Sequence, residues 1–383
     1  MTLPARNSVP MKILFLLLSL LAAASAHAQS VLPPTLSARA WLLIDHVSGQ
    51  SLVEHEADAR VEPASLTKLM TAYLTFAALK QGALKTDQVV TVSERAWKAP
   101  GSRMFIDPKR PVTVGELIQG MIIQSGNDAC IALAEAIAGS EEAFAQRMNL
   151  EARRLGLTNT RYVNATGLPD PQHYSTARDL ARLAQALIRD FPEHYTTYSR
   201  KDYTFNRITQ PNRNRLLWLD PTVDGVKTGF TENAGYCLIA SSRRGSRRLI
   251  SVVLGTDSDS MRAQESQRLL NHGFLNFDAV RLYEKNQSVS QLKVFKGTQG
   301  MVKVGFAEDF VLSLPKGMAE RLQVELGSRQ PLLAPVQQGQ AIATLKLLAE
   351  GKVLGEYPVV ALEDVPVAGM FGRAWDTLML WFK

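Results

Sequence analysis

Pro63-Ala64-Ser65-Leu66-Thr67-Lys68 opens the segment of this chain that decides its fold. After it, apolar residues recur three and four positions apart, a spacing that is typical of a helix with one buried face. Ser65 is therefore predicted near the start of a buried helix, and Lys68, three residues later, lies on the same face. The apolar residues of this helix are Leu66, Leu69, Met70, Tyr73, Leu74 and Ala77.

Ser65 and Lys68 are the residue types of a nucleophile and its base. A cation near a helix N-terminus is electrostatically unfavourable, and a capping box would have Glu or Gln in place of Lys68. The helix dipole and burial both favour the neutral amine, which can accept the Ser65 proton, whereas an ammonium cannot. The alternative interpretation is that Ser65 is only a helix N-cap.

Two further motifs follow, Ser125-Gly126-Asn127 and Lys227-Thr228-Gly229, and each pattern occurs once in the chain. Ser290-Gln291-Leu292-Lys293 also fits S-x-x-K, which shows that the first pattern is weak on its own. Each later motif, taken alone, also fits an ordinary polar turn or the end of a strand. In this order, however, the three supply a nucleophile, a base and a cationic clamp for acyl transfer on a substrate that ends in a carboxylate.

The second motif is predicted to lie between two helices. Thr113-Val114-Gly115-Glu116 is a capping box that opens the first helix, and an Ala-rich second helix covers residues 128–138. A tight connection between helices would let Ser125 and Asn127 reach across a cleft towards Ser65.

The third motif precedes a hairpin. Residues 236–242 and 249–254 are apolar, β-rich runs joined by a basic turn. Gly225 and Gly229 would let a substrate approach the backbone of this segment closely. Lys227 would attract the substrate carboxylate and help to keep the first lysine neutral.

With these motifs, the chain resembles the low-molecular-mass penicillin-binding proteins of the DacA type, the serine D-alanyl-D-alanine carboxypeptidases of the bacterial periplasm. The resemblance covers essentially the whole chain. It implies that Ser65 is the acylated nucleophile, that Lys68 is its general base, and that Ser125 and Asn127 relay protons and hold the substrate amide. The segments that carry it are 63–68, Gln124-Ser125-Gly126-Asn127-Asp128-Ala129-Cys130, Asn212-Arg213-Asn214 and Val223-Asp224-Gly225-Val226-Lys227-Thr228-Gly229.

The same resemblance implies the substrate-binding residues. Thr228, Thr231 and Arg262 would contact the terminal carboxylate, beside Lys227 and Gly229. Some relatives have His directly after the Gly of K-T-G, where this chain has Phe230. The oxyanion hole of the family uses backbone N–H groups, here those of Ser65 and Phe230, which a change of side chain need not remove. Phe230 therefore bears on substrate preference and pH dependence rather than on the reaction class.

The expected partners are peptidoglycan stem peptides, with β-lactam antibiotics as covalent inhibitors, and no cofactor is expected. The six His residues are scattered and form neither H-x-H nor H-E-x-x-H, so a zinc peptidase is disfavoured. The net charge of +7 fits an anionic envelope surface. No basic run carries a recognition motif, so nucleic acid is not an expected partner.

The chain is predicted to have four parts. Residues 1–28 have the pattern of a signal peptide, with Arg6 and Lys12, an apolar run, and Ala26-His27-Ala28 as a cleavage site; Met11 is a second possible start. Residues 29–280 would form an α+β catalytic domain, an antiparallel sheet flanked by helices as in penicillin-binding proteins and β-lactamases. Residues 281–365 alternate in polarity and are predicted to form a small all-β domain, either a spacer or a partner-binding module.

Residues 366–383 are predicted to form an amphipathic helix. Its apolar half contains Phe371, Trp375, Trp381 and Phe382, whereas the mid-helix Arg373 and Asp376 make a transmembrane span unfavourable. Such a helix suits insertion at the boundary between headgroups and acyl chains. We therefore expect a periplasmic enzyme held peripherally on the outer face of the inner membrane, the alternative being a helix packed on the β domain.

Three alternative functions remain open from the sequence. The first is endopeptidase activity on peptidoglycan cross-links, because selectivity depends on the shape of the cleft. The second is a β-lactamase-like hydrolase, which is disfavoured because residues 152–192 contain no Glu to activate a deacylating water, and because of the extra domain. The third is a non-catalytic peptidoglycan-binding module, against which the intact motifs argue.

Cys130 and Cys237 are expected to be free, buried thiols.

Overall fold

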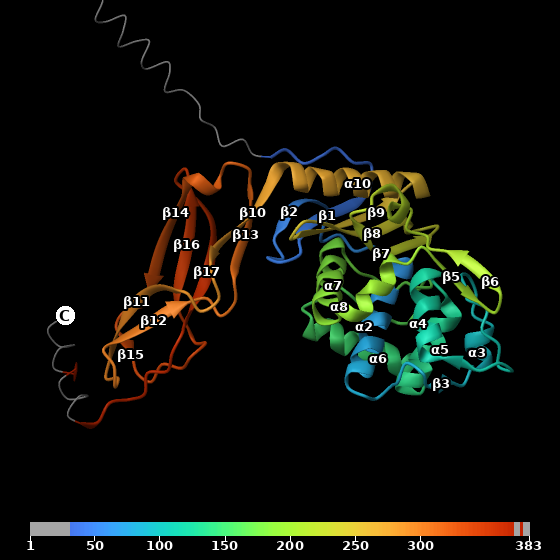
Figure 1. The fold of residues 1–383 in the computed structure, drawn as a ribbon, viewed down its shortest axis with the longest axis horizontal. Helices are drawn as coiled ribbons and strands as arrows, with labels where there is room; N and C mark the ends of the chain where they lie inside the picture. The colour runs from blue at the N-terminus through green and yellow to red at the C-terminus, as the bar shows by residue number, and fades with distance from the viewer. Residues whose placement is uncertain (1–30, 371–375, 378–383) are drawn as a thin grey trace, which may run out of the picture.

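The computed structural model describes residues 31–370 and 376–377, and it contains two parts (Figure 1). The first combines helices with a five-stranded sheet, and the second is built from strands. The predicted α+β catalytic part followed by an all-β part is therefore confirmed. The predicted signal peptide, residues 1–28, lies outside the described residues.

The sheet of the first part joins strands from both ends of that part. Its order is β2-β1-β9-β8-β7, and every neighbouring pair is antiparallel. The apolar run in β1 is buried along its whole length, which explains why this strand lies inside the sheet. The strands are β1 (Ala40–Asp45), β2 (Ser51–His55), β7 (Val223–Thr231), β8 (Gly235–Arg244) and β9 (Arg247–Thr256).

Helices cover both faces of this sheet (Figure 1). One face packs against α10 (Asp259–Asn276) and the short α9 (Leu216–Leu219), and the other faces the remaining helices, so each face has its own apolar core. The other helical segments are η1 (Ala64–Thr67), α2 (Lys68–Lys80), α3 (Glu94–Trp97), α4 (Val114–Ile123), α5 (Asn127–Ala138), α6 (Glu141–Arg154), α7 (Ala177–Asp190), α8 (Pro192–Tyr195) and η2 (Thr196–Ser199). Short strands pair as β3 (Val89–Val90) with β4 (Val112–Thr113), and as β5 (Asp202–Phe205) with β6 (Ile208–Pro211).

Side-chain caps set the starts of two helices. The predicted capping box of α4 is confirmed, because Thr113 accepts from the backbone N–H of Glu116 and the Glu116 carboxylate accepts from that of Thr113. Thr176 is the N-cap of α7, since its hydroxyl accepts from the N–H of Asp179.

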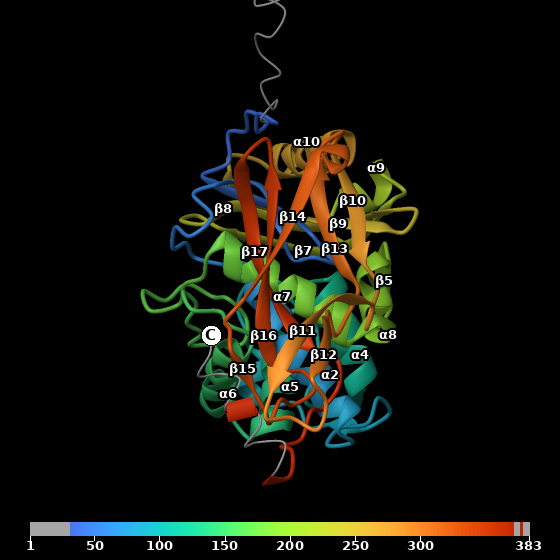
Figure 2. The same ribbon diagram turned by 90° about the vertical axis from the view of Figure 1, so that its left-hand side faces the viewer.

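The second part begins without a linker, because β10 (Phe277–Tyr283) follows α10 directly. The predicted boundary after residue 280 falls inside this strand, which pairs with β13 of the same part. Figure 2 shows the two sheets of this part from the side. Its strands are β11 (Ser288–Phe295), β12 (Met301–Gly305), β13 (Phe310–Pro315), β14 (Leu322–Ser328), β15 (Leu332–Leu333), β16 (Ala341–Ala349) and β17 (Lys352–Ala361), with the short helix η3 (Ala319–Arg321) before β14.

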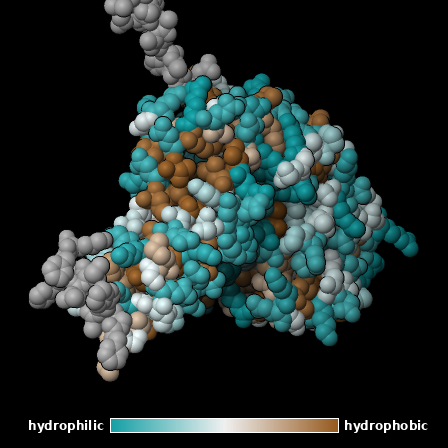
Figure 3. All heavy atoms as spheres, turned by 60° about the vertical axis from the view of Figure 1, so that its left-hand side comes forward, coloured by the Kyte–Doolittle hydropathy of each residue, from teal (hydrophilic) through white to brown (hydrophobic). Residues whose placement is uncertain are grey.

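On the face shown in Figure 3, the surface is mainly hydrophilic, with hydrophobic side chains gathered in places. Val324, Val353 and Leu354 are among the exposed apolar residues of the second part. Its interior is a separate apolar core between the two sheets, so this part has its own source of stability.

The predicted C-terminal helix is wrong for its first residues. Val367 forms a bridge with Gly297, and the N–H of Ala368 donates to the carbonyl of Lys296, so this segment lies extended against the second part. A helical wheel cannot detect such pairing with a distant strand. Most of the predicted anchor (371–375 and 378–383) lies outside the described residues. Among the residues described, no helix is long and apolar enough to cross a bilayer.

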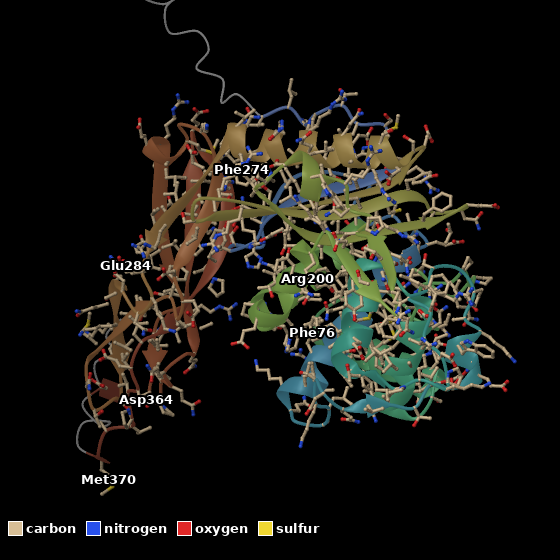
Figure 4. The ribbon with its side chains drawn as sticks, turned by 45° about the vertical axis from the view of Figure 1, so that its right-hand side comes forward. Phe76, Arg200, Phe274, Glu284, Asp364 and Met370 are labelled. Carbon is tan, nitrogen blue, oxygen red and sulfur yellow. The ribbon has the colours of Figure 1, made fainter. Side chains whose placement is uncertain are left out.

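A buried polar network joins the two parts where α10 ends, near Phe274 (Figure 4). The Asp45 carboxylate accepts from Ser313 Oγ at 2.9 Å and lies 3.4 Å from Arg247 Nε. Arg247 also donates to the Phe277 carbonyl and to Ser313 Oγ. Asp45 and Ser313 are each only 1% exposed, so solvent cannot replace these contacts.

We predict that Asp45→Ala destabilises the protein by about 3 kcal/mol, because it leaves a largely buried guanidinium without its carboxylate. The measurement is the free energy of unfolding in urea. Glu356→Ala is the control, since its ion pair with Lys346 is roughly half exposed and should contribute little to stability. Equal effects of the two substitutions would contradict the prediction.

Candidate active site

The Ser65 turn begins the helical part of the site. Ser65 lies in the 3-10 turn η1, and α2 begins at Lys68, so the hydroxyl and the amine point the same way. Lys68 Nζ lies 2.9 Å from Ser65 Oγ. The N-cap positions of η1 and α2 are Pro63 and Thr67, so Ser65 is not a helix N-cap.

The Lys68 amine lies where three segments meet. Besides Ser65, it donates to Asn127 Oδ1 and to the carbonyl of Thr166, each at 2.7 Å. Lys68 is only 1% exposed. Burial lowers the pKa of this amine to about 8, and the positive charge of Arg213 acts in the same direction. Lys68 is thus a base that can be neutral near physiological pH.

Ser125 links the second motif to the third. It lies between α4 and α5 with a left-handed φ of 62°, and its Oγ accepts from Lys227 Nζ at 2.9 Å. Burial lowers the pKa of Lys227 well below its usual value, and the nearby Lys68 amine lowers it further. Burial and Arg213 are the causes that lower the pKa of Lys68, so the effect of Lys227 on Lys68 stays a prediction.

Strand β7 packs directly against the Ser65 turn. A Cβ on Gly229 would lie 3.1 Å from the Pro63 carbonyl oxygen and 3.3 Å from the Ala64 Cβ. These distances are tighter than ordinary contacts, so glycine lets the strand come close to the nucleophile. β7 is also an edge strand, which leaves backbone groups on its outer side free of a neighbouring strand.

A cavity of about 460 Å³ opens beside Ser65. It is lined by residues from all three motifs and from three segments that were not predicted to lie there. A larger cavity of about 700 Å³ lies between Leu79 and His194, but none of the motif residues lines it. The residues that line the smaller cavity are Ser65, Gly101, Ser102, Ser125, Arg213, Thr228, Gly229, Phe230, Tyr236 and Arg262.

Thr231 is not among the residues that the structure brings together. Its hydroxyl donates to Glu62 at 3.1 Å and accepts from the N–H of Ala234. Side chains alternate along a strand, so Thr231 shares a face with Gly229 and not with Thr228. The expected contact of Thr231 with the substrate carboxylate is therefore not supported.

Two guanidinium groups, Arg213 and Arg262, face the cavity. Arg262 donates to the Gly229 carbonyl at 3.1 Å and also to Asp259, which fixes it beside β7. Burial lowers the pKa of both guanidiniums, yet their usual value is so high that they stay charged. This end of the cavity can therefore bind a carboxylate.

An aromatic pair forms the wall next to Arg262. The rings of Phe230 and Tyr236 have centroids 4.3 Å apart, and the Arg262 guanidinium lies 5.4 Å from the centre of the Tyr236 ring. The Phe230 side chain remains half exposed. The Phe230 ring thus gives the mouth of the cavity an apolar surface. A His at this position would place a titratable imidazole there instead.

Sequence reasoning missed several contributors. Arg213 appeared only as part of a segment that carried the resemblance, without a role. Tyr236 was assigned only to a predicted strand. Thr166 contributes a backbone carbonyl, which no side-chain pattern can reveal. Gly101 and Ser102 lie in an irregular segment that no motif marked.

The remaining candidates lie elsewhere. Ser290, from the second S-x-x-K match, is in β11 of the second part. Cys130 and Cys237 are buried and unpaired, as predicted, and burial raises the pKa of the Cys130 thiol to about 12. Within residues 31–370 and 376–377, no three His, Cys, Asp or Glu side chains come together as metal ligands would.

Comparison with known proteins agrees with this geometry. Residues 27–258 match the D-alanyl-D-alanine carboxypeptidase family of peptidases (S11), and residues 277–367 match the C-terminal domain of penicillin-binding protein 5. The D-alanyl-D-alanine carboxypeptidase DacC of Escherichia coli K12 is 44% identical over 94% of this chain and 92% of its own length.

Solved structures give the same result. Penicillin-binding protein 5 from Haemophilus influenzae has a TM-score of 0.84 at 40% identity, over 88% of this chain and 99% of that one. Penicillin-binding protein D2 from Listeria monocytogenes, in its ampicillin-bound form, has a TM-score of 0.59 at 33% identity, over 63% of this chain and 99% of that one. The chain therefore belongs to the family of serine D-alanyl-D-alanine carboxypeptidases, the low-molecular-mass penicillin-binding proteins.

Proposed function

We propose that the chain removes the terminal D-alanine from peptidoglycan stem pentapeptides through an acyl-enzyme on Ser65. The observation that carries this proposal is the contact of Ser65 Oγ with a buried amine whose pKa is lowered to about 8. A neutral amine at hydrogen-bond distance is what a serine needs to become a nucleophile.

In the first step the Ser65 oxygen attacks the carbonyl of the penultimate D-alanine, and its proton passes to Lys68. The bond to the terminal D-alanine then breaks, and the leaving amine takes a proton through Ser125, which contacts Lys227. The Asn127 side chain is fixed between Lys68 and the Pro100 carbonyl, so it holds the amine in place beside Ser65. Its contact with the substrate amide is proposed from the resemblance alone. Water then releases the shortened peptide from Ser65.

Recognition of the substrate uses the opposite end of the cavity. Arg213 and Arg262, with the Thr228 hydroxyl, would bind the terminal carboxylate, because charge-assisted contacts are the stronger class of hydrogen bond. The backbone N–H groups of Ser65 and Phe230 would stabilise the oxyanion. The position of Phe230 on an edge strand supports this role.

β-Lactams should react at the same serine. The Listeria relative was solved in an ampicillin-bound form. A β-lactam presents a strained amide and a carboxylate, which match the nucleophile and the guanidinium end of this cavity. We propose that the drug acylates Ser65 and is released slowly.

We further propose a periplasmic location, with the C-terminal segment on the inner membrane. Met370 is 75% exposed and lies at the end of the second part that is remote from the catalytic part (Figure 4). The aromatic residues that follow it in sequence suit the membrane interface. A segment in this place could hold the enzyme to the membrane without obstructing the cavity.

The central test uses fluorescent penicillin and a peptide that ends in D-Ala-D-Ala. The wild type should be labelled on Ser65 and release D-alanine, whereas Ser65→Ala should do neither. Lys68→Ala should slow acylation by roughly 10²–10⁴-fold, the usual contribution of a positioned base. Mass spectrometry that places the adduct on Ser290 would refute the assignment.

The pH dependence of acylation tests the protonation state of Lys68. Since only the neutral amine can accept the serine proton, and its pKa is about 8, the second-order rate constant should rise with pH up to that value. Below it, the slope should approach about tenfold per pH unit, and above it the rate should level off. A rate that is flat from pH 6 to 9 would contradict this assignment.

Truncation tests the membrane segment. A chain that ends after Met370 keeps the hydrogen bonds of Val365 with Val336 and of Ala368 with Lys296. It should be recovered in the soluble fraction, whereas the full chain should sediment with inner-membrane vesicles. Both should react with penicillin at the same rate. Equal sedimentation of the two proteins would exclude this segment as the anchor.

A further inference from the structure

An irregular segment, residues 100–106, forms the wall of the cavity opposite β7. It lies between α3 and β4 and contributes Gly101 and Ser102 to the lining. Regular secondary structure does not hold it in place. Its position must therefore come from contacts with its neighbours.

One carboxylate binds three successive N–H groups of this segment. Asp128, in the first turn of α5, is 1% exposed. Its Oδ1 accepts from the N–H of Met104 at 3.0 Å, and its Oδ2 accepts from Phe105 at 2.8 Å and Ile106 at 3.2 Å. Oδ1 also accepts from the N–H of Ala129 at 2.9 Å. Four backbone donors thus depend on one buried side chain.

The packing around this carboxylate is close. A Cβ on Gly126 would lie 2.7 Å from Asp128 Oδ1 and 3.1 Å from the N of Met104. The glycine in the middle of the second motif therefore allows the segment to approach Asp128. On its other side, the segment is held by Gln210 of β6, whose Nε2 donates to the Arg103 carbonyl at 3.0 Å.

The segment in turn fixes Asn127. The N–H of Asn127 donates to the Ser102 carbonyl, and its Nδ2 donates to the Pro100 carbonyl, each at 2.7 Å. Because Nδ2 is committed to Pro100, Oδ1 is the atom that faces Lys68. The orientation of the amide that contacts the base therefore depends on where the segment lies.

We propose that Asp128 is a positioning residue for the acyl-transfer reaction: it fixes segment 100–106 and, through that segment, the Asn127 amide against Lys68. This inference rests on the proposed roles of Ser65 and Lys68. Asp128 itself touches neither Ser65 nor the cavity lining, and acts through the backbone that it binds.

The charge of Asp128 gives the proposal a second readout. Three titratable groups near Lys68 raise its pKa: Cys130, Asp128 and Glu141. The Arg213 guanidinium lowers it. Lys227 is the other charged group close to this amine. Removing the Asp128 charge should therefore lower the pKa of Lys68 further. The pH at which acylation levels off should move down by the same amount.

The test is Asp128→Asn in the full chain, with Asp107→Asn as matched control. The amide keeps the shape of the carboxylate, but its NH₂ would face the donors of Phe105 and Ile106. Asp107 carries the same charge nearby, but it accepts from Lys109 N–H in an exposed turn. Rates are measured with fluorescent penicillin and divided by the number of sites that react.

We expect Asp128→Asn to acylate roughly 100-fold more slowly per reactive site, because a misplacement near 1 Å costs about that much. Its pH profile should level off at lower pH, and the amides of 104–106 should lose protection from hydrogen exchange while those of β8 and β9 keep it. Asp107→Asn should match the wild type in every measurement. A purely structural role would lower the fraction of reactive sites but leave their rate and pH profile unchanged, which would overturn the proposal.

Two outcomes separate this inference from the proposed function. If the wild type is not acylated at Ser65, the proposed function fails, and hydrogen exchange still decides whether Asp128 fixes the segment. If Asp128→Asn does not fold, exchange in the wild type decides: the amides of 104–106 must then exchange as slowly as those of β8. Exchange at the rate of an exposed loop would overturn the proposal.

Discussion

The structure of the site depends on the burial of one amine, that of Lys68. Burial of a lysine side chain away from water destabilises its charged form. The protonation equilibrium therefore shifts towards the neutral amine. Its three hydrogen-bond partners come from three separate segments: η1, the start of α5 and the 164–167 turn. The interaction that makes the amine a base therefore also holds these segments together.

The rest of the fold brings a fourth segment, β7, to this point. The sheet joins β1 from the start of the chain to β9, and β8 then places β7 at the edge nearest η1. Gly229 permits this approach, and a Cβ on Gly167 would lie only 1.8 Å from the Ala64 carbonyl oxygen on another side of the same turn. The Ser65 turn is thus enclosed by backbone on two sides, and side-chain bulk at either glycine would displace it. This close enclosure accounts for the small residues around the nucleophile.

The sequence was informative wherever a local rule sets the structure. The capping box of Thr113 and Glu116 predicted the start of α4, and polarity patterns predicted β8, β9 and the strands of the second part. It was misleading where the outcome depends on pairing between distant segments. Pro366–Ala368 satisfies a helical wheel, but its backbone pairs with residues near Gly297. Thr231 adjoins the third motif, yet its hydroxyl donates to Glu62, which is distant in sequence.

Three of the contributors to the site that were missed share one physical cause. Thr166 and Ser102 act through backbone carbonyls, and Asp128 acts through backbone N–H groups of a segment 22–24 residues away. Backbone groups are the same in every residue, so no motif can mark them. The Ser65 and Lys68 side chains can be read from the sequence, whereas the groups that orient them appear only once the chain has folded. The same holds for the place of the Arg213 and Tyr236 side chains in the cavity wall.

The connection between the two parts bears on how the enzyme meets its substrate. Because α10 continues into β10 without a linker, and Asp45, Arg247 and Ser313 are bonded at the junction, the second part is fixed to the catalytic sheet. Peptidoglycan is a network that cannot diffuse into a cavity as a free peptide does. If the segment after Met370 is the anchor, as proposed, this fixed junction would present the cavity at a constant height and angle. The range of stem peptides that it reaches would then be set by lateral diffusion of the enzyme and by motion of the network, rather than by bending within the protein.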